Sequence, residues 1–120
     1  MPRTMLQNLE KAIVKSQTDT DDSSDWIADL GCSEKFGPRC TKDIMPCLTK
    51  AIADRGGFWL VKRDDFTSDR ELLRCQGFDP NRITKPPSVP DGKFRQMIGN
   101  SFTVTVFEAL FQAILPSVGL

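Results

Sequence analysis

The sequence contains no histidine and no tyrosine, and neither sign of charge is in excess. Its 120 residues include 16 basic and 16 acidic side chains. Without histidine, the chain cannot form a Ser-His-Asp triad, a histidine-ligated metal site or an imidazole acid–base pair. The balanced charge is not typical of a free-standing nucleic-acid-binding protein, which carries a basic excess. The length supports one modest domain, so a cofactor domain and a separate substrate domain do not both fit.

Long apolar runs are also missing. No run approaches the roughly 20 residues that a membrane-spanning helix needs, so we expect no membrane partner. The N-terminal stretch MPRTMLQNLEKAIVKSQ is amphipathic and lacks the apolar core of a secretory signal. The four cysteines are too few and too irregularly spaced for the disulfide framework of a small secreted domain. We therefore expect an intracellular, reducing location, the nucleus if the source is eukaryotic and the cytoplasm otherwise.

Apolar spacing marks the elements of the N-terminal half. Residues 4 to 16 are predicted to form an amphipathic helix, whereas the acidic stretch 16 to 25 has no apolar residue and is expected to be a solvated loop that buries nothing. The apolar run at residues 26 to 30 predicts a strand, and residues 31 to 47, rich in glycine, proline and cysteine, are expected to be irregular. The apolar positions of the predicted helix are Met5, Leu6, Leu9, Ile13 and Val14.

Stronger signals follow in the second half. Residues 58 to 61 predict a strand, because aromatic and β-branched residues follow a Gly-Gly turn there. Residues 68 to 71 and 105 to 108 have the sequence of a capping box, which predicts one helix that stops at Gly77 and a last helix that ends before Pro116. The apolar face of the last helix comprises Phe107, Leu110, Phe111 and Ile114.

Two stretches carry no clear element. Residues 44 to 52 fit neither a helix nor a strand convincingly. Residues 84 to 93 contain three prolines and predict an extended connector between the two capped helices.

The cysteine spacing does not favour a metal site. Cys32, Cys40 and Cys47 are separated by seven and six residues, and Cys75 stands apart. Zinc sites usually show tighter pairs, with histidine often completing the ligand set. We therefore expect no metal site and interpret the thiols as small buried hydrophobic groups.

The most specific functional signal comes from two short blocks, FTSDRELLRCQGF at residues 66 to 78 and FRQMIGNS at residues 94 to 101. This pair resembles the C-terminal part of DNA cytosine-5 methyltransferases, in which a Thr-x-x-Glu helix runs into Arg-Leu-Gln-Gly-Phe and a Gln and Gly-Asn-Ser/Ala block follows. Ser68 stands in the threonine place and Cys75 in the leucine place. The resemblance covers roughly residues 25 to 115. The matching residues are Glu71, Arg74, Gln76, Gly77, Phe78, Gln96, Gly99, Asn100 and Ser101.

The resemblance implies an α/β enzyme of which this chain is a C-terminal piece. As an isolated fragment it is expected to be α+β, with short strands, two or three helices and an incomplete cofactor-binding core. We expect one partial domain over residues 1 to 120, with a helix and acidic loop over 1 to 24 and the methyltransferase segment over 25 to 115. The implied reaction is methyl transfer from S-adenosylmethionine to cytosine position 5 of a base flipped out of DNA.

The resemblance also assigns candidate site residues. Gly99 permits a tight turn, and Asn100 and Ser101 help to hold S-adenosylmethionine, while the last helix packs on the cofactor domain. The alternative for Asn100 and Ser101 is an ordinary cap of the last helix. Gln76 and Phe78 are expected to be packing residues. Weaker candidates for facing DNA phosphate, with a solvated turn as their alternative, are Thr49, Arg55, Gly56 and Gly57.

No catalytic residue is predicted within this chain. Asp29 to Ser33 resembles a cofactor loop that follows a strand, but the next residues are turn-like. Pro46 and Cys47 resemble the nucleophile of the family, but the glutamine that normally follows and the Glu-Asn-Val segment are missing, so Cys47 is interpreted as structural. We expect the chain alone to be inactive and to bind DNA only as part of a complete enzyme.

The expected partner is therefore an N-terminal catalytic portion, in the same chain or in a complementary subunit. Alone, the chain is expected to be marginally stable or to self-associate through the bare apolar face of its last helix. The alternative function is a stand-alone protein-interaction module derived from such an enzyme, which binds its partner through that helix.

Overall fold

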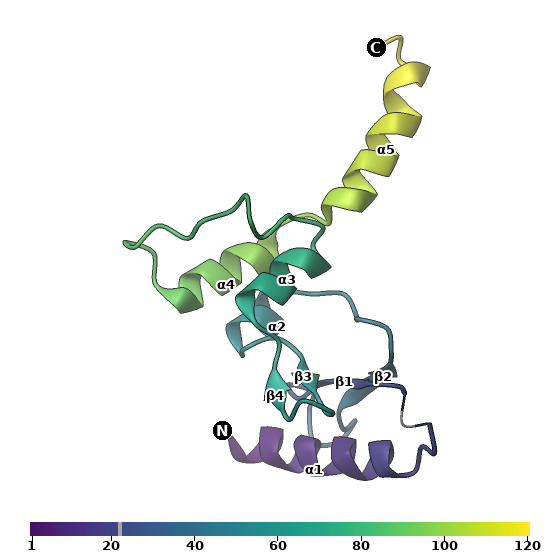
Figure 1. Ribbon diagram of the computed structural model, residues 1–120, viewed down its shortest axis with the longest axis vertical. Helices are drawn as coiled ribbons and strands as arrows, with labels where there is room; N and C mark the ends of the chain where they lie inside the picture. The colour runs from purple at the N-terminus through teal and green to yellow at the C-terminus, as the bar shows by residue number, and fades with distance from the viewer. Residues whose placement is uncertain (22) are drawn as a thin grey trace.

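A computed structural model describes residues 1–21 and 23–120 of the chain (Figure 1). Position 22, within the predicted acidic loop, lies outside the described residues. The elements in chain order are α1 (Arg3–Gln17), β1 (Trp26–Asp29), β2 (Arg39–Lys42), α2 (Lys50–Asp54), β3 (Trp59–Leu60), β4 (Asp65–Phe66), α3 (Asp69–Cys75), α4 (Asp91–Asn100) and α5 (Val104–Ser117).

The described strands form one small sheet in the order β2-β1-β3-β4, and each pair is antiparallel. Ile27 is paired with Leu60 and Ala28 with Trp59, so the two strands predicted from their apolar residues lie next to each other. Helices together with a small antiparallel sheet make the chain an α+β protein, as expected, but α1 to α5 are more than the two or three helices that were expected.

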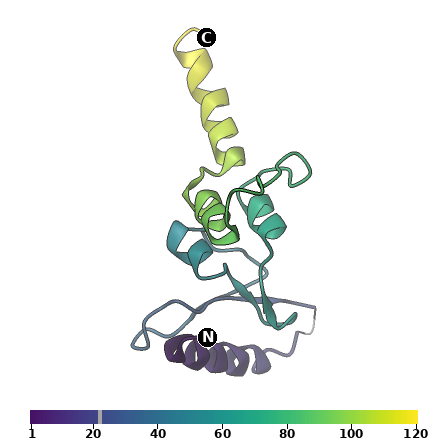
Figure 2. The same cartoon turned by 90° about the vertical axis from the view of Figure 1, so that its left-hand side faces the viewer.

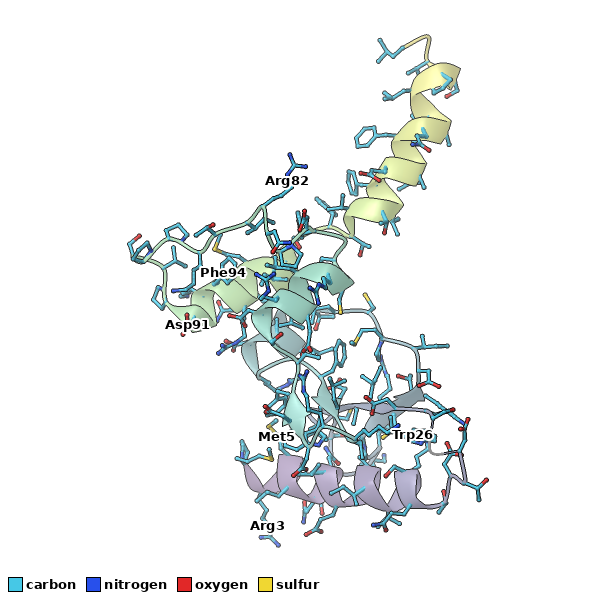
Figure 3. The ribbon with its side chains drawn as sticks, viewed as in Figure 1. Arg3, Met5, Trp26, Arg82, Asp91 and Phe94 are labelled. Carbon is cyan, nitrogen blue, oxygen red and sulfur yellow. The ribbon has the colours of Figure 1, made fainter. Side chains whose placement is uncertain are left out.

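The core has two parts. One part lies between α1 and the sheet, where Met5 and Ala12 of α1 pack with Ala28, Leu30 and Trp59. Figure 3 shows Met5 directed toward the sheet and Arg3 directed away from it. The other part lies among α2, α3, α4 and β1; its buried residues are Ile27, Leu48, Ile52, Ala53, Phe58, Leu72, Leu73 and Ile98.

The last helix stands apart from both parts of the core. In two views at right angles, α5 projects from the α3–α4 end of the molecule, opposite α1 (Figures 1 and 2). No residue of α5 is buried, and the molecule is elongated, with extents of 53 × 37 × 28 Å. Among the described helices, α5 is the one with no buried residue.

Several local predictions are confirmed. The amphipathic helix at residues 4 to 16 is α1, and the strands predicted at 26 to 30 and 58 to 61 contain β1 and β3. The first capping box is present: the Ser68 side chain accepts from the Glu71 amide, and the Glu71 side chain accepts from the Ser68 amide. Helix α3 ends before Gly77, which has the left-handed φ of 81°.

Three predictions are wrong for reasons of tertiary structure. Residues 31 to 47 are not wholly irregular, because β2 pairs along the whole length of β1. Residues 91 to 93 of the predicted connector begin α4, whose Ile98 packs into the core. The acidic stretch does bury a side chain, Ser24, whose hydroxyl donates to Asp21.

The capping box predicted at residues 105 to 108 is also absent. The N-cap of α5 is Thr103, and no side chain caps this helix. The Val104 amide donates instead to the backbone oxygen of Gln76, at 2.8 Å. Helix α5 continues through Pro116, and the chain reverses only at Gly119, whose φ is 80°. A backbone acceptor from another element thus takes the place of the predicted cap.

Candidate functional site

The two sequence blocks pack together in the core, and the buried side chain of Gln76 adds polar contacts between them. Its Nε2 donates to the backbone oxygens of Ile98 (3.1 Å) and Ser101 (3.2 Å). Its Oε1 accepts from the Thr103 hydroxyl at 3.1 Å. Together with the bond from the Val104 amide, these contacts tie the end of α3 to the turn between α4 and α5. We refer to Gln76, Gly77 and residues 98 to 104 as the junction.

Gly77 lets the start of α5 approach closely. A side-chain carbon added at Gly77 would lie 3.2 Å from the Thr105 nitrogen and 3.3 Å from the Val104 Cβ. Its positive φ of 81° also strains any residue with a side chain. Gly77 therefore ends α3 and makes room for α5 at the same position.

Gly99 does not form the predicted tight turn. It lies inside α4, and a Cβ there would come within 2.7 Å of the Lys50 Cα and the Thr49 oxygen and within 2.9 Å of the Ala53 Cβ. Its role in the fold is close packing of α4 against α2. The Cα face of Gly99 is thus occupied by α2 and is closed to a ligand.

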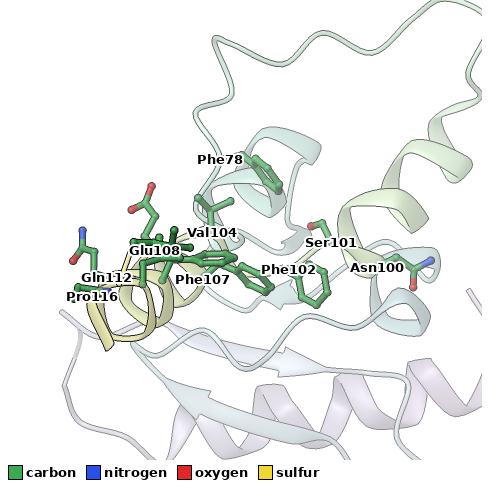
Figure 4. A pocket seen from close by; sticks show the side chains of 12 residues that line it. Phe78, Asn100, Ser101, Phe102, Val104, Phe107, Glu108, Gln112 and Pro116 are labelled. Carbon is green, nitrogen blue, oxygen red and sulfur yellow. The ribbon is translucent and has the colours of Figure 1, made fainter. Parts of the chain in front are cut away.

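Asn100 and Ser101 do not cap the last helix. Asn100 is the final residue of α4, and Ser101 is its C-cap. The Ser101 hydroxyl and amide both donate to the Ile98 oxygen, at 2.6 Å and 3.1 Å. The ordinary-cap alternative for this pair is therefore wrong, while the exposed Asn100 side chain lies at the edge of the groove beside α5 (Figure 4).

An open groove of about 910 Å³ runs along α5 from the junction (Figure 4). Its wall is aromatic: the rings of Phe102 and Phe107 lie 4.5 Å apart between centroids, and those of Phe107 and Phe111 lie 5.4 Å apart. Phe78 also lines the groove, beyond its predicted packing role. The polar side chains of the lining are Asn100, Ser101, Glu108 and Gln112.

The groove fits S-adenosylmethionine in part. A nucleoside needs an apolar wall with a few polar groups at its edge, and the aromatic lining, the Asn100 amide and the Glu108 carboxylate are of that kind. Ser101 offers less, because its hydroxyl proton is already bound to Ile98. Of the three predicted cofactor residues, Asn100 fits best and Gly99 does not fit.

The predicted DNA-facing residues are not gathered at one place. Arg55 and Gly56 line a second groove of about 840 Å³, near the start of α3. Thr49 is the N-cap of α2 and accepts from the Ile52 amide. Gly57 faces the Thr67 hydroxyl, which a Cβ would meet at 2.2 Å. Of the four residues, Arg55 and Gly56 line this groove.

This second groove is electrically balanced. Its cations are Arg55, Arg63 and Arg95, and its anions are Asp54, Asp65 and Asp69. Arg63 is bound to Glu71 and to the Phe66 oxygen. Arg55 lies 3.7 Å from Asp29, and its guanidinium lies over Gly31. The groove lacks the basic excess that contact with a phosphate backbone favours.

The thiols differ in exposure. Cys47 is exposed and the other three thiols are only partly buried, so the interpretation of the four as buried hydrophobic groups is wrong for Cys47 and holds only in part for Cys32, Cys40 and Cys75. Burial raises the pKa of the Cys40 and Cys75 thiols, which makes them weak nucleophiles. Among residues 1–21 and 23–120, no group of three or more His, Cys, Asp or Glu side chains is placed to hold a metal ion.

One stretch is long enough and apolar enough to span a membrane, whereas the apolar runs of the sequence predicted no such stretch. The stretch Asp91–Ser117 comprises 27 residues and contains an 18-residue window with a mean hydropathy of 1.3, but residues 101 to 103 separate α4 from α5 within it. A single stretch of this kind is weak evidence for a membrane helix.

The chain was also compared with known proteins. No protein-family model, curated protein or solved structure matches it.

Proposed function

We propose that this chain is the C-terminal segment of an S-adenosylmethionine-dependent DNA cytosine-5 methyltransferase and that it acts together with an N-terminal catalytic portion. The observation that carries the proposal is the direct contact between the two blocks of the resemblance. Gln76 of the first block is hydrogen-bonded to Ser101 of the second, 25 residues later in the chain. Two blocks that serve one site must lie together in the folded chain, and these two blocks do.

The bare surface of α5 supports the same proposal. Its exposed apolar side chains include Leu110, Phe111 and Ile114, each about half exposed. Apolar residues on such a protruding helix favour burial against another surface. In the proposed enzyme, the cofactor domain of the catalytic portion covers this helix.

The chemistry divides between the two portions. S-adenosylmethionine, when bound, supplies the methyl group. The Asn100 amide can donate to and accept from polar groups of the ligand, and the aromatic wall of the groove excludes water beside it. The nucleophile and the base-binding carboxylate come from the catalytic portion, since no such pair is predicted in this chain.

Reconstitution tests the proposal. The chain is mixed with an N-terminal methyltransferase polypeptide that stops before its own Gln-Gly-Phe block, and transfer of a radiolabelled methyl group to duplex DNA is measured. We expect activity only in the mixture. Asn100→Ala should weaken S-adenosylmethionine binding about tenfold through the lost amide contacts.

Asn81→Ala is the matched control, because Asn81 is an exposed asparagine outside the groove. An equal loss in both variants, or an inactive mixture across several catalytic portions, would count against the proposal.

The exposed helix also favours a second function, a stand-alone module that binds a protein partner through α5. This function predicts no methyl transfer in any mixture and no effect of Asn100→Ala on the partner. Substitutions at Leu110 or Ile114 would abolish partner binding. The same reconstitution thus separates the two functions.

A further inference from the structure

The buried polar contacts of the junction converge on one residue. Gln76 is 4% exposed, yet its side chain has an oxygen and an amino group that both need partners. Both groups are satisfied, the amino group by two backbone oxygens and the oxygen by the Thr103 hydroxyl. The amide orientation follows from these partners, because the reversed amide would place its oxygen against two carbonyl oxygens.

These bonds reach the last turn of α4, the short segment that joins α4 to α5 and the first residue of α5. The Gln76 side chain holds Ile98, Ser101 and Thr103, and its backbone oxygen holds Val104. The Ser101 amide donates to the Ile98 oxygen and the Thr103 oxygen accepts from the Phe107 amide, so the segment is tied to a helix at each end and to Gln76 by the contacts above. Gly77 leaves room for α5 next to this anchor.

We infer that Gln76 is a positioning residue, which sets the direction of α5 and holds Asn100 at the edge of the groove in the geometry that binds S-adenosylmethionine. The cofactor part of this inference rests on the proposed function. A packing residue of the same size would fill the space but would remove the Gln76 donor from the Ser101 oxygen and one of the three donors from the Ile98 oxygen. The inference therefore depends on hydrogen bonding and not on volume.

Two variants of similar volume test this point. Gln76→Met removes every polar contact of the side chain, and Gln76→Glu replaces the amino donor with an oxygen that faces two carbonyls. In the free chain, we expect amide hydrogen exchange at Val104 to accelerate about tenfold or more in both variants. Gln17→Glu on the exposed end of α1 is the control and should leave Val104 unchanged.

Thr103→Val gives a milder test in a variant that keeps the Gln76 side chain. It removes the hydroxyl that donates to Gln76 Oε1 and should accelerate exchange at Val104 by a smaller factor. In the Gln76→Met background, Thr103→Val should add nothing, because the shared bond is already absent. Additive effects of the two substitutions would overturn the inference.

In the reconstituted enzyme, Gln76→Met should weaken S-adenosylmethionine binding about tenfold and leave the KM for DNA unchanged. Unchanged amide exchange at Val104 in Gln76→Met would overturn the positioning role. Faster exchange at Val104 with an unchanged affinity for S-adenosylmethionine would also overturn it. Failure of the unsubstituted mixture to bind S-adenosylmethionine would instead overturn the proposed function and the cofactor part of the inference with it. In that event, the Val104 measurements in the free chain would still decide the role in directing α5.

Discussion

Glu71 shows how one carboxylate can hold both a helix end and a neighbouring turn. Its side chain accepts from the Ser68 amide at the start of α3 and forms a paired ion contact with Arg63, which also donates to the Phe66 oxygen. The hydrogen bond from Arg63 is the main cause that lowers the pKa of Glu71 to about 2. The ionised form is therefore favoured in the folded chain.

The pH dependence of stability follows from this shift. Because the folded pKa lies below the ordinary value of 4.5, the Glu71 contribution is present above that value and is lost as the pH falls toward about 2. Glu71→Gln should lower the free energy of unfolding by about 1 kcal/mol at neutral pH, as expected for a capping contact with an exposed ion pair.

Urea unfolding of the unsubstituted chain and of Glu71→Gln at a series of pH values checks this expectation. The difference between them should shrink between pH 4.5 and about 2, where the carboxyl becomes protonated. A difference that stays constant across this range would show that the ion pair contributes nothing.

At the scale of elements, α4 depends on the absence of a side chain at Gly99. Gly99→Ala would place its methyl group 2.7 Å from the backbone of α2. We expect a loss of about 1–3 kcal/mol in the free energy of unfolding, since the two helices must move apart.

Gly92→Ala is the matched control in the same helix. The nearest atom to its added carbon is a flexible Arg95 nitrogen at 4.0 Å, so this variant should gain about 0.5–1 kcal/mol from helix propensity. Denaturant unfolding of the two variants should give changes of opposite sign. A neutral Gly99→Ala would contradict the described packing of α4 on α2.

Some elements could be predicted from the sequence because their signals are local. Apolar spacing identified α1, and the capping box with Gly77 identified α3. Strand β2 and helix α4 were not recognised, because β2 is defined by pairing with β1 and α4 by packing on α2. The local sequence of an element does not show which distant element it will pair with or pack on.

The candidate site was predictable only in its location. The two blocks marked residues 66 to 78 and 94 to 101, and the structure joins them through Gln76. Gln76 was expected only to pack. Its buried hydrogen bonds could not be predicted, because their acceptors lie more than 20 positions away in the sequence. Asn8 was likewise missed; it is fully buried in α1 and donates to the Leu30 and Cys32 oxygens.

At the scale of the whole molecule, the free chain should self-associate through α5. Leu110 and Ile114 are each 50% exposed, so their joint replacement by glutamine should leave the free energy of unfolding within about 0.5 kcal/mol. Each lost apolar contact should weaken association by about 1 kcal/mol, so the dissociation constant should rise about tenfold or more.

Sedimentation velocity over a range of concentrations measures this effect. Val14→Gln on α1 is the control, since Val14 is an exposed apolar residue outside α5. A free chain that stays monomeric at high concentration, with a sharp cooperative melt, would contradict the view that α5 needs a covering surface.

The central claim is that α5 is covered by a catalytic portion in the natural protein. The most direct test is the intact mass of the natural polypeptide captured under denaturing conditions with an antibody to residues 104 to 117, together with the polypeptides that copurify with it under native conditions. We predict either a polypeptide several times larger than 13.4 kDa or a 13.4 kDa chain bound to a methyltransferase catalytic subunit. A 13.4 kDa chain that copurifies with no such subunit would contradict the claim.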